Sequence, residues 1–417
     1  MIQPTKRLAF ISSFALLTCA ACLITGALAA DPAKMLWPQY RGPDRSGISS
    51  ETGLLKVWPA EGPKVLWKVP LGDGYSGISV AGDRLYTMHS QGGDDVIACF
   101  NARDGKEVWR TRVEARWTDE MGDGPRSTPT VDGGVVYAVS SRGLLVAVAA
   151  DTGQKVWEKN LQDVFGAQVP HWGVSTSPLV EGDLVVVDAG GAPGKSLVAL
   201  DKKTGATRWT SYTDRPGYSA PLAVDMLGVR QILSFAGSSL VSVAAGDGKV
   251  LWSVPWKTSY DVNAAMPVFL PPNRVFISSS YDTGGAVYEI KKTGDAYKTS
   301  EVWKNRTMKN HFNSSVHAAG YLYGFDDATL KCVDAATGEE KWRQRGFAKG
   351  SLLMADGQLI VFSENGLLAL VEATPEAYKE KARAQILEGR TWTMPSLADR
   401  KLFLRNQKLM VALDLAG

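Results

Sequence analysis

Cysteine, histidine and net charge are all scarce in this 417-residue chain. Four cysteines and four histidines are present, and 46 Lys and Arg residues against 43 Asp and Glu residues leave a formal charge of +3. This near balance excludes a protein that binds nucleic acid through bulk charge. The histidines form no His-x-His or His-x-x-x-His pair, so we expect no metal site. No Gly-x-Ser-x-Gly nucleophile motif is present either.

Long apolar runs are also missing, except for one near the N-terminus. Residues 8–28 carry no charge, follow Lys6 and Arg7, and lead into small residues that end at Ala30. This pattern predicts a secretory signal peptide over residues 1–30 and a mature chain over residues 31–417. Two alternatives are an uncleaved membrane anchor, because about 20 apolar residues can span a bilayer, and lipidation at Cys22.

Only two cysteines lie beyond this segment. Cys99 and Cys332 each precede a tryptophan, Trp109 and Trp342, by ten residues, so they occupy the same position in two repeat units. A disulfide requires Cα atoms within about 7 Å, which units that are not neighbours cannot provide. We expect two buried, free thiols.

A repeat organises the rest of the chain. The pattern [Asp/Thr]-Gly-x-x-x-Trp recurs about every 46 residues and follows two short, alternating apolar runs, such as residues 135–139 and 144–148. Short runs separated by Gly and Asp turns predict an antiparallel meander. Each tryptophan then begins an outer strand and covers the seam between sheets. The structural tryptophans of the repeat are Trp67, Trp109, Trp157, Trp209, Trp252, Trp303 and Trp342.

The number of units predicts the fold class. Eight openings rich in small residues and proline recur along the chain, and the last unit has only three strands before Gly417. Residues 65–69 carry an outer-strand tryptophan without a preceding unit, so they can supply the missing strand. We predict an all-β fold, a single eight-bladed β-propeller closed by an N-terminal strand. In blade seven, residues 379–386 should form either a helical turn or a displaced outer strand.

These motifs resemble a known family. The Leu-Asp-x-x-Thr-Gly-x-x-x-Trp unit ending at Trp209 resembles the pyrroloquinoline-quinone-like (PQQ-like) propeller repeat, and residues 37–43, Trp-Pro-Gln-Tyr-Arg-Gly-Pro, are similar to the opening of exported bacterial propellers of the BamB family. That resemblance implies a place in the periplasm or on the periplasmic face of the outer membrane. The quinone-using dehydrogenases of the superfamily carry adjacent cysteines, and this chain has no Cys-Cys pair.

A candidate site lies where the loops lead into the innermost strands. In a propeller these loops reach one face, and aromatic, histidine and arginine residues gather at these positions. The predicted partner-binding rim consists of Tyr75, Arg126, His171, Trp172, Tyr218, Asn263, His311, Asn313, Lys349, Arg390 and Trp392.

Three functions remain open from the sequence. The first is a monomeric, exported, non-catalytic scaffold that binds a protein or peptide partner in envelope assembly, without a cofactor. The second is an oxidoreductase dependent on PQQ and calcium, with Trp172 or Trp392 as the stacking floor and Asp73 or Asp261 near the metal. The third is carbohydrate or polymer binding by the rim aromatics.

Overall fold

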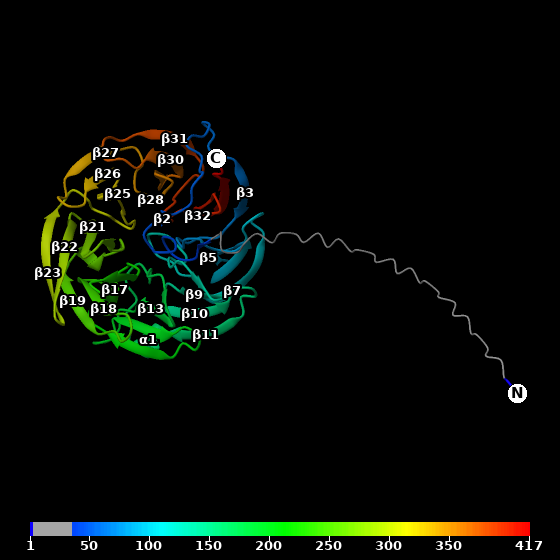
Figure 1. The fold of residues 1–417 in the computed structure, drawn as a ribbon, viewed down its shortest axis with the longest axis horizontal. Coiled ribbons are helices and arrows are strands. Elements are labelled where there is room, and N and C mark those ends of the chain that lie inside the picture. Colours follow the sequence, from blue (N-terminus) through cyan, green and yellow to red (C-terminus); the bar gives the residue numbers. More distant parts are fainter. Residues whose placement is uncertain (3–35) are drawn as a thin grey trace. The chain divides into compact units, whose positions relative to one another are not determined.

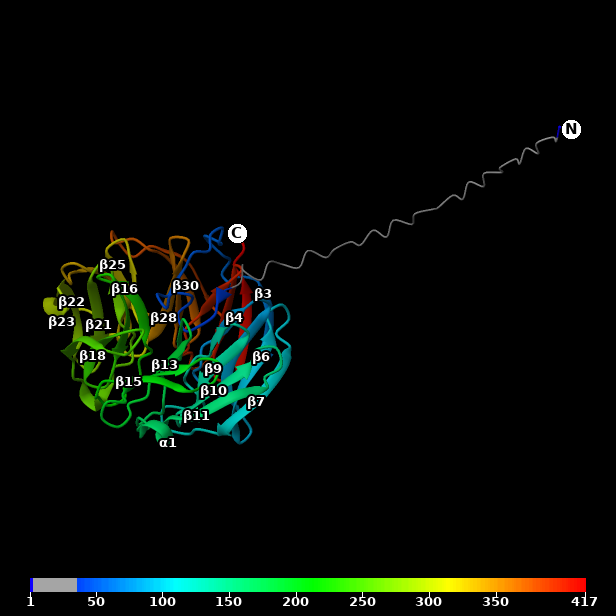
Figure 2. The same ribbon diagram turned by 60° about the horizontal axis from the view of Figure 1, so that its bottom comes forward.

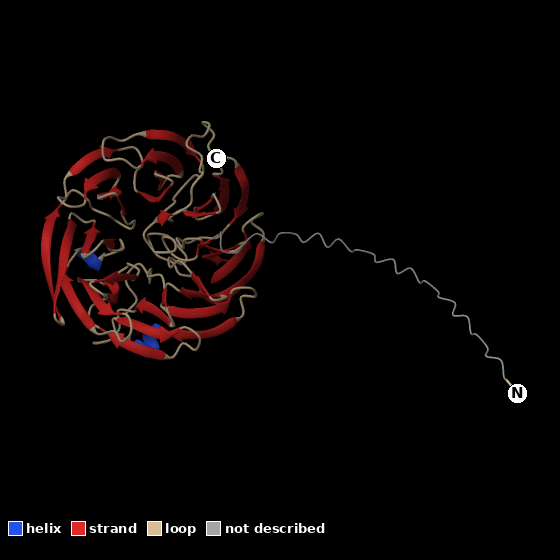
Figure 3. Ribbon diagram, viewed as in Figure 1, coloured by secondary structure: helices blue, strands red, loops and turns tan. Residues whose placement is uncertain are grey.

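A computed structural model describes residues 1–2 and 36–417. Eight antiparallel sheets are arranged in a ring around a central axis (Figure 1). Strands dominate the fold, with two short helices, α1 (Leu161–Phe165) and the 3-10 helix η2 (Ser259–Asp261), between them (Figure 3). The predicted eight-bladed β-propeller is therefore confirmed. Most of the predicted signal peptide, including Cys22, lies outside the described residues.

The first four blades follow the chain in order, with each blade running from its innermost to its outermost strand. Blade one begins with an extra strand from the N-terminal segment. Their strands are β1 (Leu36–Trp37), β4 (Ser79–Ala81), β5 (Arg84–Gln91), β6 (Asp94–Asn101) and β7 (Glu107–Ala115); β8 (Thr130–Asp132), β9 (Val135–Val139), β10 (Leu144–Ala149) and β11 (Lys155–Asn160); β12 (Leu179–Glu181), β13 (Leu184–Asp188), β14 (Leu197–Asp201) and β15 (Thr207–Ser211); and β16 (Leu222–Met226), β17 (Val229–Phe235), β18 (Ser239–Ala244) and β19 (Val250–Pro255).

The last four blades have the same order, and blades seven and eight each take one strand from the N-terminal segment. Their strands are β20 (Val268–Leu270), β21 (Arg274–Ser279), β22 (Gly284–Thr293) and β23 (Ala296–Asn305); β24 (Val316–Ala318), β25 (Tyr321–Asp326), β26 (Thr329–Asp334) and β27 (Glu340–Gln344); β2 (Ile48–Ser49), β28 (Gly350–Ala355), β29 (Gln358–Ser363), β30 (Leu367–Glu372) and β31 (Glu380–Gln385); and β32 (Ser396–Ala398), β33 (Lys401–Arg405), β34 (Leu409–Asp414) and β3 (Val65–Pro70).

The ring closes through blade eight. Strand β3 pairs antiparallel with β34, with Trp67 opposite Ala412 and Val69 opposite Met410. Figure 2 shows β3 beside the C-terminal strands. The N-terminal strand thus completes the last blade as predicted, and closure protects the sheet edge of β34.

The repeat tryptophans join neighbouring blades. The indole of Trp157 in blade two lies on Gly205 in blade three, where an added Cβ would come within 2.8 Å of the ring, and its Nε1 donates to the carbonyl of Lys202 at 3.0 Å. The turn glycine is therefore needed for its positive φ of 69° and for this close approach. The other ring-on-glycine pairs are Trp67 on Gly105, Trp109 on Gly153, Trp209 on Gly248 and Trp303 on Gly338.

Two blades depart from this arrangement. Blade five has a long hairpin in place of the tight turn, and Trp252 of blade four instead donates to the side chain of Gln231 at 3.0 Å. In blade seven the outer strand β31 shows that the helical alternative for residues 379–386 is wrong. Trp342 donates there to the carbonyl of Thr374 at 2.7 Å and packs on Tyr378 with ring centroids 5.8 Å apart.

The N-terminal segment fills the central channel. Strand β1 pairs with β4 in blade one, and β2 pairs in parallel with β28 in blade seven. Between them, Arg45 donates to the carbonyls of Ser177 and Pro221 at 3.2 and 2.9 Å. Arg41 donates to two carbonyls of blade six, at 2.9 and 2.8 Å. We call residues 36–49 the channel plug.

Both predicted free thiols are confirmed. Cys99 in blade one and Cys332 in blade six are buried and unbonded to each other. Burial raises the pKa of each thiol to about 12, so neither is a reactive nucleophile at neutral pH. Among residues 1–2 and 36–417, no helix is both long and apolar enough to cross a membrane.

Candidate functional site

A pocket of about 180 Å³ lies where the channel opens between the loops that lead into the innermost strands. We call this side of the propeller the loop face and the opposite side, which carries the Gly turns, the turn face. Tyr40 of the channel plug belongs to the lining, so the plug supplies part of the pocket. Eight aromatic or imidazole rings line it: Tyr40, Tyr75, Trp172, Tyr218, Tyr281, His311, Phe312 and Trp392.

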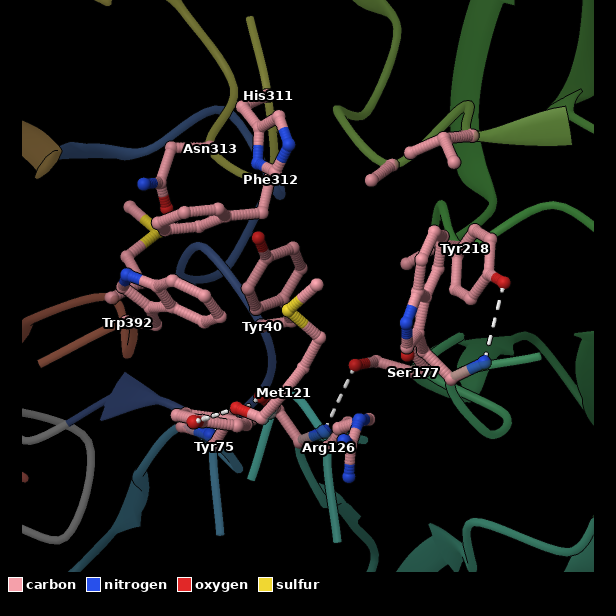
Figure 4. A pocket seen from close by; sticks show the side chains of 18 of the residues that line it. Tyr40, Tyr75, Met121, Arg126, Ser177, Tyr218, His311, Phe312, Asn313 and Trp392 are labelled. Carbon is pink, nitrogen blue, oxygen red and sulfur yellow. Dashed lines mark hydrogen bonds between the residues drawn. The ribbon is translucent and has the colours of Figure 1, made fainter. Parts of the chain in front are cut away.

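Rings from different blades contact one another around this pocket (Figure 4). Trp392, from the loop before β32, has its ring centroid 5.4 Å from that of Tyr75, which precedes β4. Phe312, before β24, lies 5.1 Å from Trp392. On the other side Trp172 lies 5.8 Å from Tyr218. The lining residues come from loops of several blades, so closure of the ring brings these distant residues together.

The lining is nearly free of net charge. The Arg126 side chain is only 8% exposed, and its Nη2 lies 2.5 Å from Asp119; it also donates to the carbonyl of Gly122. Burial, aided by Lys349, lowers the pKa of His311 to about 4, so this imidazole is neutral at pH 7. The pocket can therefore accept an apolar group without leaving a buried charge unpaired.

A loop that carries Met121 borders the pocket. The Tyr75 hydroxyl donates to the Met121 carbonyl at 2.6 Å, and Arg390 Nη1 donates to the same oxygen at 2.6 Å. The Arg390 guanidinium in turn lies 4.3 Å from the ring centroid of Trp392. These contacts tie together the loops that lead into blades one, two and eight.

Several predicted rim residues come together at this pocket, although their partner-binding role stays a prediction. His171 is exposed beside Glu120, at 3.0 Å, and Arg390 lies outside the lining, as does Lys349. The rim residues that line the pocket are Tyr75, Arg126, Trp172, Tyr218, His311, Asn313 and Trp392.

The prediction that Asn263 belongs to the partner-binding rim is wrong. Its side chain is completely buried, where its Nδ2 donates to the carbonyl of Ala236 at 2.7 Å and its Oδ1 accepts from Ser279 at 2.8 Å. An amide beside a strand opening can satisfy backbone groups instead of facing solvent, and this one holds the loop between blades four and five.

Several lining side chains were missing from the predicted rim. Phe312 lies between two residues that the loop pattern did select, Met121 belongs to the same loop as Arg126, and Tyr281 belongs to a loop that the pattern did not cover. Tyr40 reaches the pocket through the channel. The Trp-Pro-Gln-Tyr-Arg motif marks that segment, but no rule of spacing places it inside the ring.

The residues present do not fit a calcium-held quinone. The two proposed metal-side carboxylates are already paired, Asp73 with Arg116 at 2.6 Å and Asp261 with Arg215 at 2.7 Å. Neither lines the pocket. Across the described part of the chain, no group of three or more His, Cys, Asp or Glu side chains is arranged to hold a metal ion. Calcium requires six to eight oxygen ligands, so the oxidoreductase alternative is not favoured.

Most of the known relatives that match this chain share one name. The family model described as outer membrane protein assembly factor BamB matches residues 51–163, 114–344 and 295–416. The protein of that name from Shewanella oneidensis is 24% identical over 313 residues, which cover 71% of this chain and 70% of that protein. A quinoprotein alcohol dehydrogenase of Pseudomonas putida is 22% identical over 300 residues, covering 70% of this chain but only 44% of that enzyme.

Solved structures show the same fold. The crystal structure of BamB from Moraxella catarrhalis has a TM-score of 0.60 at 16% identity and covers 84% of this chain and 97% of that one. A quinohemoprotein alcohol dehydrogenase from Pseudomonas putida has a TM-score of 0.66 at 13% identity, covering 92% of this chain and 80% of that one. Because the family model spans nearly all of the propeller, this chain belongs to the family of outer membrane protein assembly factor BamB.

Proposed function

We propose that this protein is an exported, non-catalytic scaffold that binds a protein or peptide partner through its loop face during outer membrane protein assembly. The observation that carries the proposal is the aromatic pocket at the mouth of the plugged channel. Aromatic and Arg side chains dominate binding energy at protein interfaces. The relatives that match the chain are named as outer membrane protein assembly factors.

The rigidity of the loop face supports binding rather than catalysis. The hydrogen bonds of Tyr75 and Arg390 join neighbouring loops, and that of Arg126 braces its own loop, so little conformational freedom is lost when a partner docks. The described residues around the pocket offer no activated nucleophile, since both thiols are buried elsewhere and the imidazole of His311 has a hydrogen bond only with the Tyr281 hydroxyl, at 3.3 Å.

Photo-crosslinking in cells of the source bacterium tests this proposal. A photoreactive amino acid is placed at Lys349 or His171 on the loop face, and at Asp225 on the turn face as the matched control. We expect crosslinks to envelope proteins from the loop face that decrease when Trp392→Ala is added. Crosslinks confined to Asp225, with none from the loop face, would overturn the assigned surface.

Export and oligomeric state belong to the same proposal. We expect the mature protein to begin near residue 31 after removal of the signal peptide, to reside in the periplasm or at the periplasmic face of the outer membrane, and to be a monomer. Mass spectrometry of the purified native protein distinguishes cleavage near Ala30 from lipidation at Cys22. Sedimentation measures the oligomeric state, and dye-linked assays with quinone and calcium should show no dehydrogenase turnover.

A further inference from the structure

We propose that the pocket on the loop face holds one uncharged aromatic or large aliphatic side chain of the partner polypeptide, and that Tyr40 of the channel plug sets its depth. This inference rests on the proposed function and names the chemistry of the group that the partner presents.

The plug makes the pocket blind. Tyr40 belongs to the lining, and its neighbour Arg41 is anchored to blade six by hydrogen bonds at 2.9 and 2.8 Å. Arg45 anchors the other end of the loop to blades three and four. A ligand that enters from the loop face therefore meets a fixed floor instead of an open channel.

The volume matches one side chain. The pocket measures about 180 Å³, and an apolar protein cavity of about 150 Å³ is large enough to bind benzene. A single phenyl, indole or branched aliphatic group would fill such a space.

The chemistry of the lining excludes a charged ligand group. Arg126, the charged residue in the lining, is engaged by Asp119 and by two backbone carbonyls, so it has little capacity left for an incoming carboxylate. No carboxylate lines the pocket to receive a cation. A charged group would lose its hydration without gaining an opposite charge.

Two methionines allow the pocket to adapt to different apolar groups. Met121 and Met394 lie in the lining with the aromatic rings, and the flexible thioether chain fills irregular gaps and contacts aromatic rings favourably. We therefore expect phenylalanine and leucine side chains to bind with similar affinity, while charged side chains do not.

Methionine-methyl NMR of the mature protein measures this directly. The probes are the N-acetyl amides of phenylalanine, leucine, glutamate and lysine, each titrated to tens of millimolar. We expect the Met121 and Met394 resonances to shift with phenylalanine and leucine, with dissociation constants on the order of millimolar, while Met88 and Met226 stay unmoved. The glutamate and lysine probes should bind at least about tenfold more weakly.

Three variants locate and shape the site. Trp392→Ala should weaken the phenylalanine probe at least about tenfold. Val164→Ala is the control, since Val164 is exposed in α1, on the segment that leads into β12, and does not line the pocket, and it should leave binding unchanged. Tyr40→Ala should deepen the pocket and shift preference from the leucine probe to N-acetyl-tryptophan amide. Unchanged shifts of the remaining methionines verify that each variant is folded.

The outcomes separate this inference from the proposed function. If loop-face crosslinks form but no probe moves Met121 or Met394, or if the charged probes bind as well as phenylalanine, the inference is wrong and the scaffold proposal stands. If the apolar probes bind as expected but no envelope protein crosslinks to the loop face, the scaffold proposal fails alone. If Tyr40→Ala keeps the wild-type preference between the leucine probe and N-acetyl-tryptophan amide, Tyr40 does not set the depth of the pocket.

Discussion

At the scale of single residues, the stability of this propeller depends on a pairing of tryptophan with glycine that repeats around the ring. In five of the seven repeat tryptophans the indole covers the turn glycine of the next blade, and its Nε1 donates to a backbone carbonyl, as Trp209 does to Ala245 at 3.2 Å. A buried tryptophan with a satisfied N–H loses no hydrogen bond on burial. The glycine is required because a side chain would occupy the position of the ring.

Replacing a seam tryptophan should therefore be costly. We expect Trp209→Ala to lower the free energy of unfolding by about 3–5 kcal/mol, because the change leaves a cavity between two blades. Chemical denaturation measures the loss. Trp172→Ala is the control, since this ring lies in the half-open pocket, and it should cost less. An unchanged denaturation midpoint for Trp209→Ala would contradict the seam role.

Two glycine variants separate backbone strain from crowding. Gly205 and Gly294 both have positive φ, 69° and 58°, but an added Cβ meets Trp157 at 2.8 Å in the first and nothing within 4 Å in the second. Gly294→Ala should cost only the strain of about 1–2 kcal/mol. Gly205→Ala should cost at least about 1 kcal/mol more. Equal losses in the free energy of unfolding, measured by urea denaturation, would show that the Trp157 ring can move away from a Cβ at position 205 without cost.

Asp188 should make stability depend on pH. Burial raises the pKa of this carboxyl to about 7, although a hydrogen bond from Ser234 partly opposes the rise. In the unfolded chain the pKa of an Asp carboxyl is about 3.9. The folded state therefore binds an extra proton between pH 4 and 7, so the wild type loses stability as pH rises through that window. Asparagine does not titrate, so the free energy of unfolding of Asp188→Asn, relative to that of the wild type, should increase by about 2 kcal/mol between pH 5 and pH 8.

Urea denaturation of the wild type and of Asp188→Asn, at pH 5 and at pH 8, measures how the difference in their free energies of unfolding changes with pH. His89 and His311, whose pKa values burial lowers to about 4, change stability in the same window. They do so equally in the wild type and in the variant, so their contribution cancels from the difference between the two proteins. A difference that is the same at both pH values would mean that Asp188 stays ionised throughout.

At the scale of elements, the channel plug is the feature that distinguishes this propeller from a plain ring of blades. Arg41 and Arg45 are buried without a carboxylate partner among the described residues, and backbone carbonyls receive their donors. Burial lowers the pKa of Arg45 to about 9. The planar fork of donors suits acceptors that point inward from several blades.

Arg45→Lys should loosen the plug. A lysine ammonium cannot reach the Ser177 and Pro221 carbonyls in the same fork, and buried acceptors left unpaired cost about 1–3 kcal/mol. We expect a lower unfolding midpoint and faster proteolysis within residues 36–49. Arg103→Lys at an exposed position is the control and should change neither. Unchanged proteolysis of Arg45→Lys would show that the remaining contacts suffice.

At the scale of the whole molecule, closure joins the two ends of the chain in one sheet. Strand β3 covers β34, and Leu54 forms an isolated bridge with Ala416. Without β3 the long edge of β34 would be free to pair with another chain.

A chain of residues 71–417 tests this closure. It lacks the plug and β3, so we expect it to aggregate or to lose cooperative unfolding, as light scattering and denaturation would show. A chain of residues 31–417 serves as the reference and should unfold in one transition. A shortened chain that stayed monomeric with the same midpoint would contradict the closing role of β3.

The sequence predicted those parts of the fold that have a local signature. The eight openings rich in small residues and proline indicated the number of blades, and Trp67 without a preceding unit indicated the closing strand. The plug could not be predicted, because Arg41 and Arg45 donate to backbone carbonyls that leave no mark in the sequence. Asn263 was misplaced on the rim for the same reason, since its partners are also backbone groups.

Strand closure in blade eight has a consequence for the order in which the protein can fold during synthesis. Val65 pairs with Leu413, which is about 350 residues later in the chain, so β3 must wait until blade eight has been made before it finds its partner. Until then β3 lacks its pairing with β34, and the part of the plug that contacts blades six and seven lacks its partners. Pairings between segments so far apart in the sequence slow folding and prolong the exposure of aggregation-prone intermediates. We therefore expect this protein to depend more on a chaperone that binds unfolded chains than a protein in which each blade is completed in sequence order.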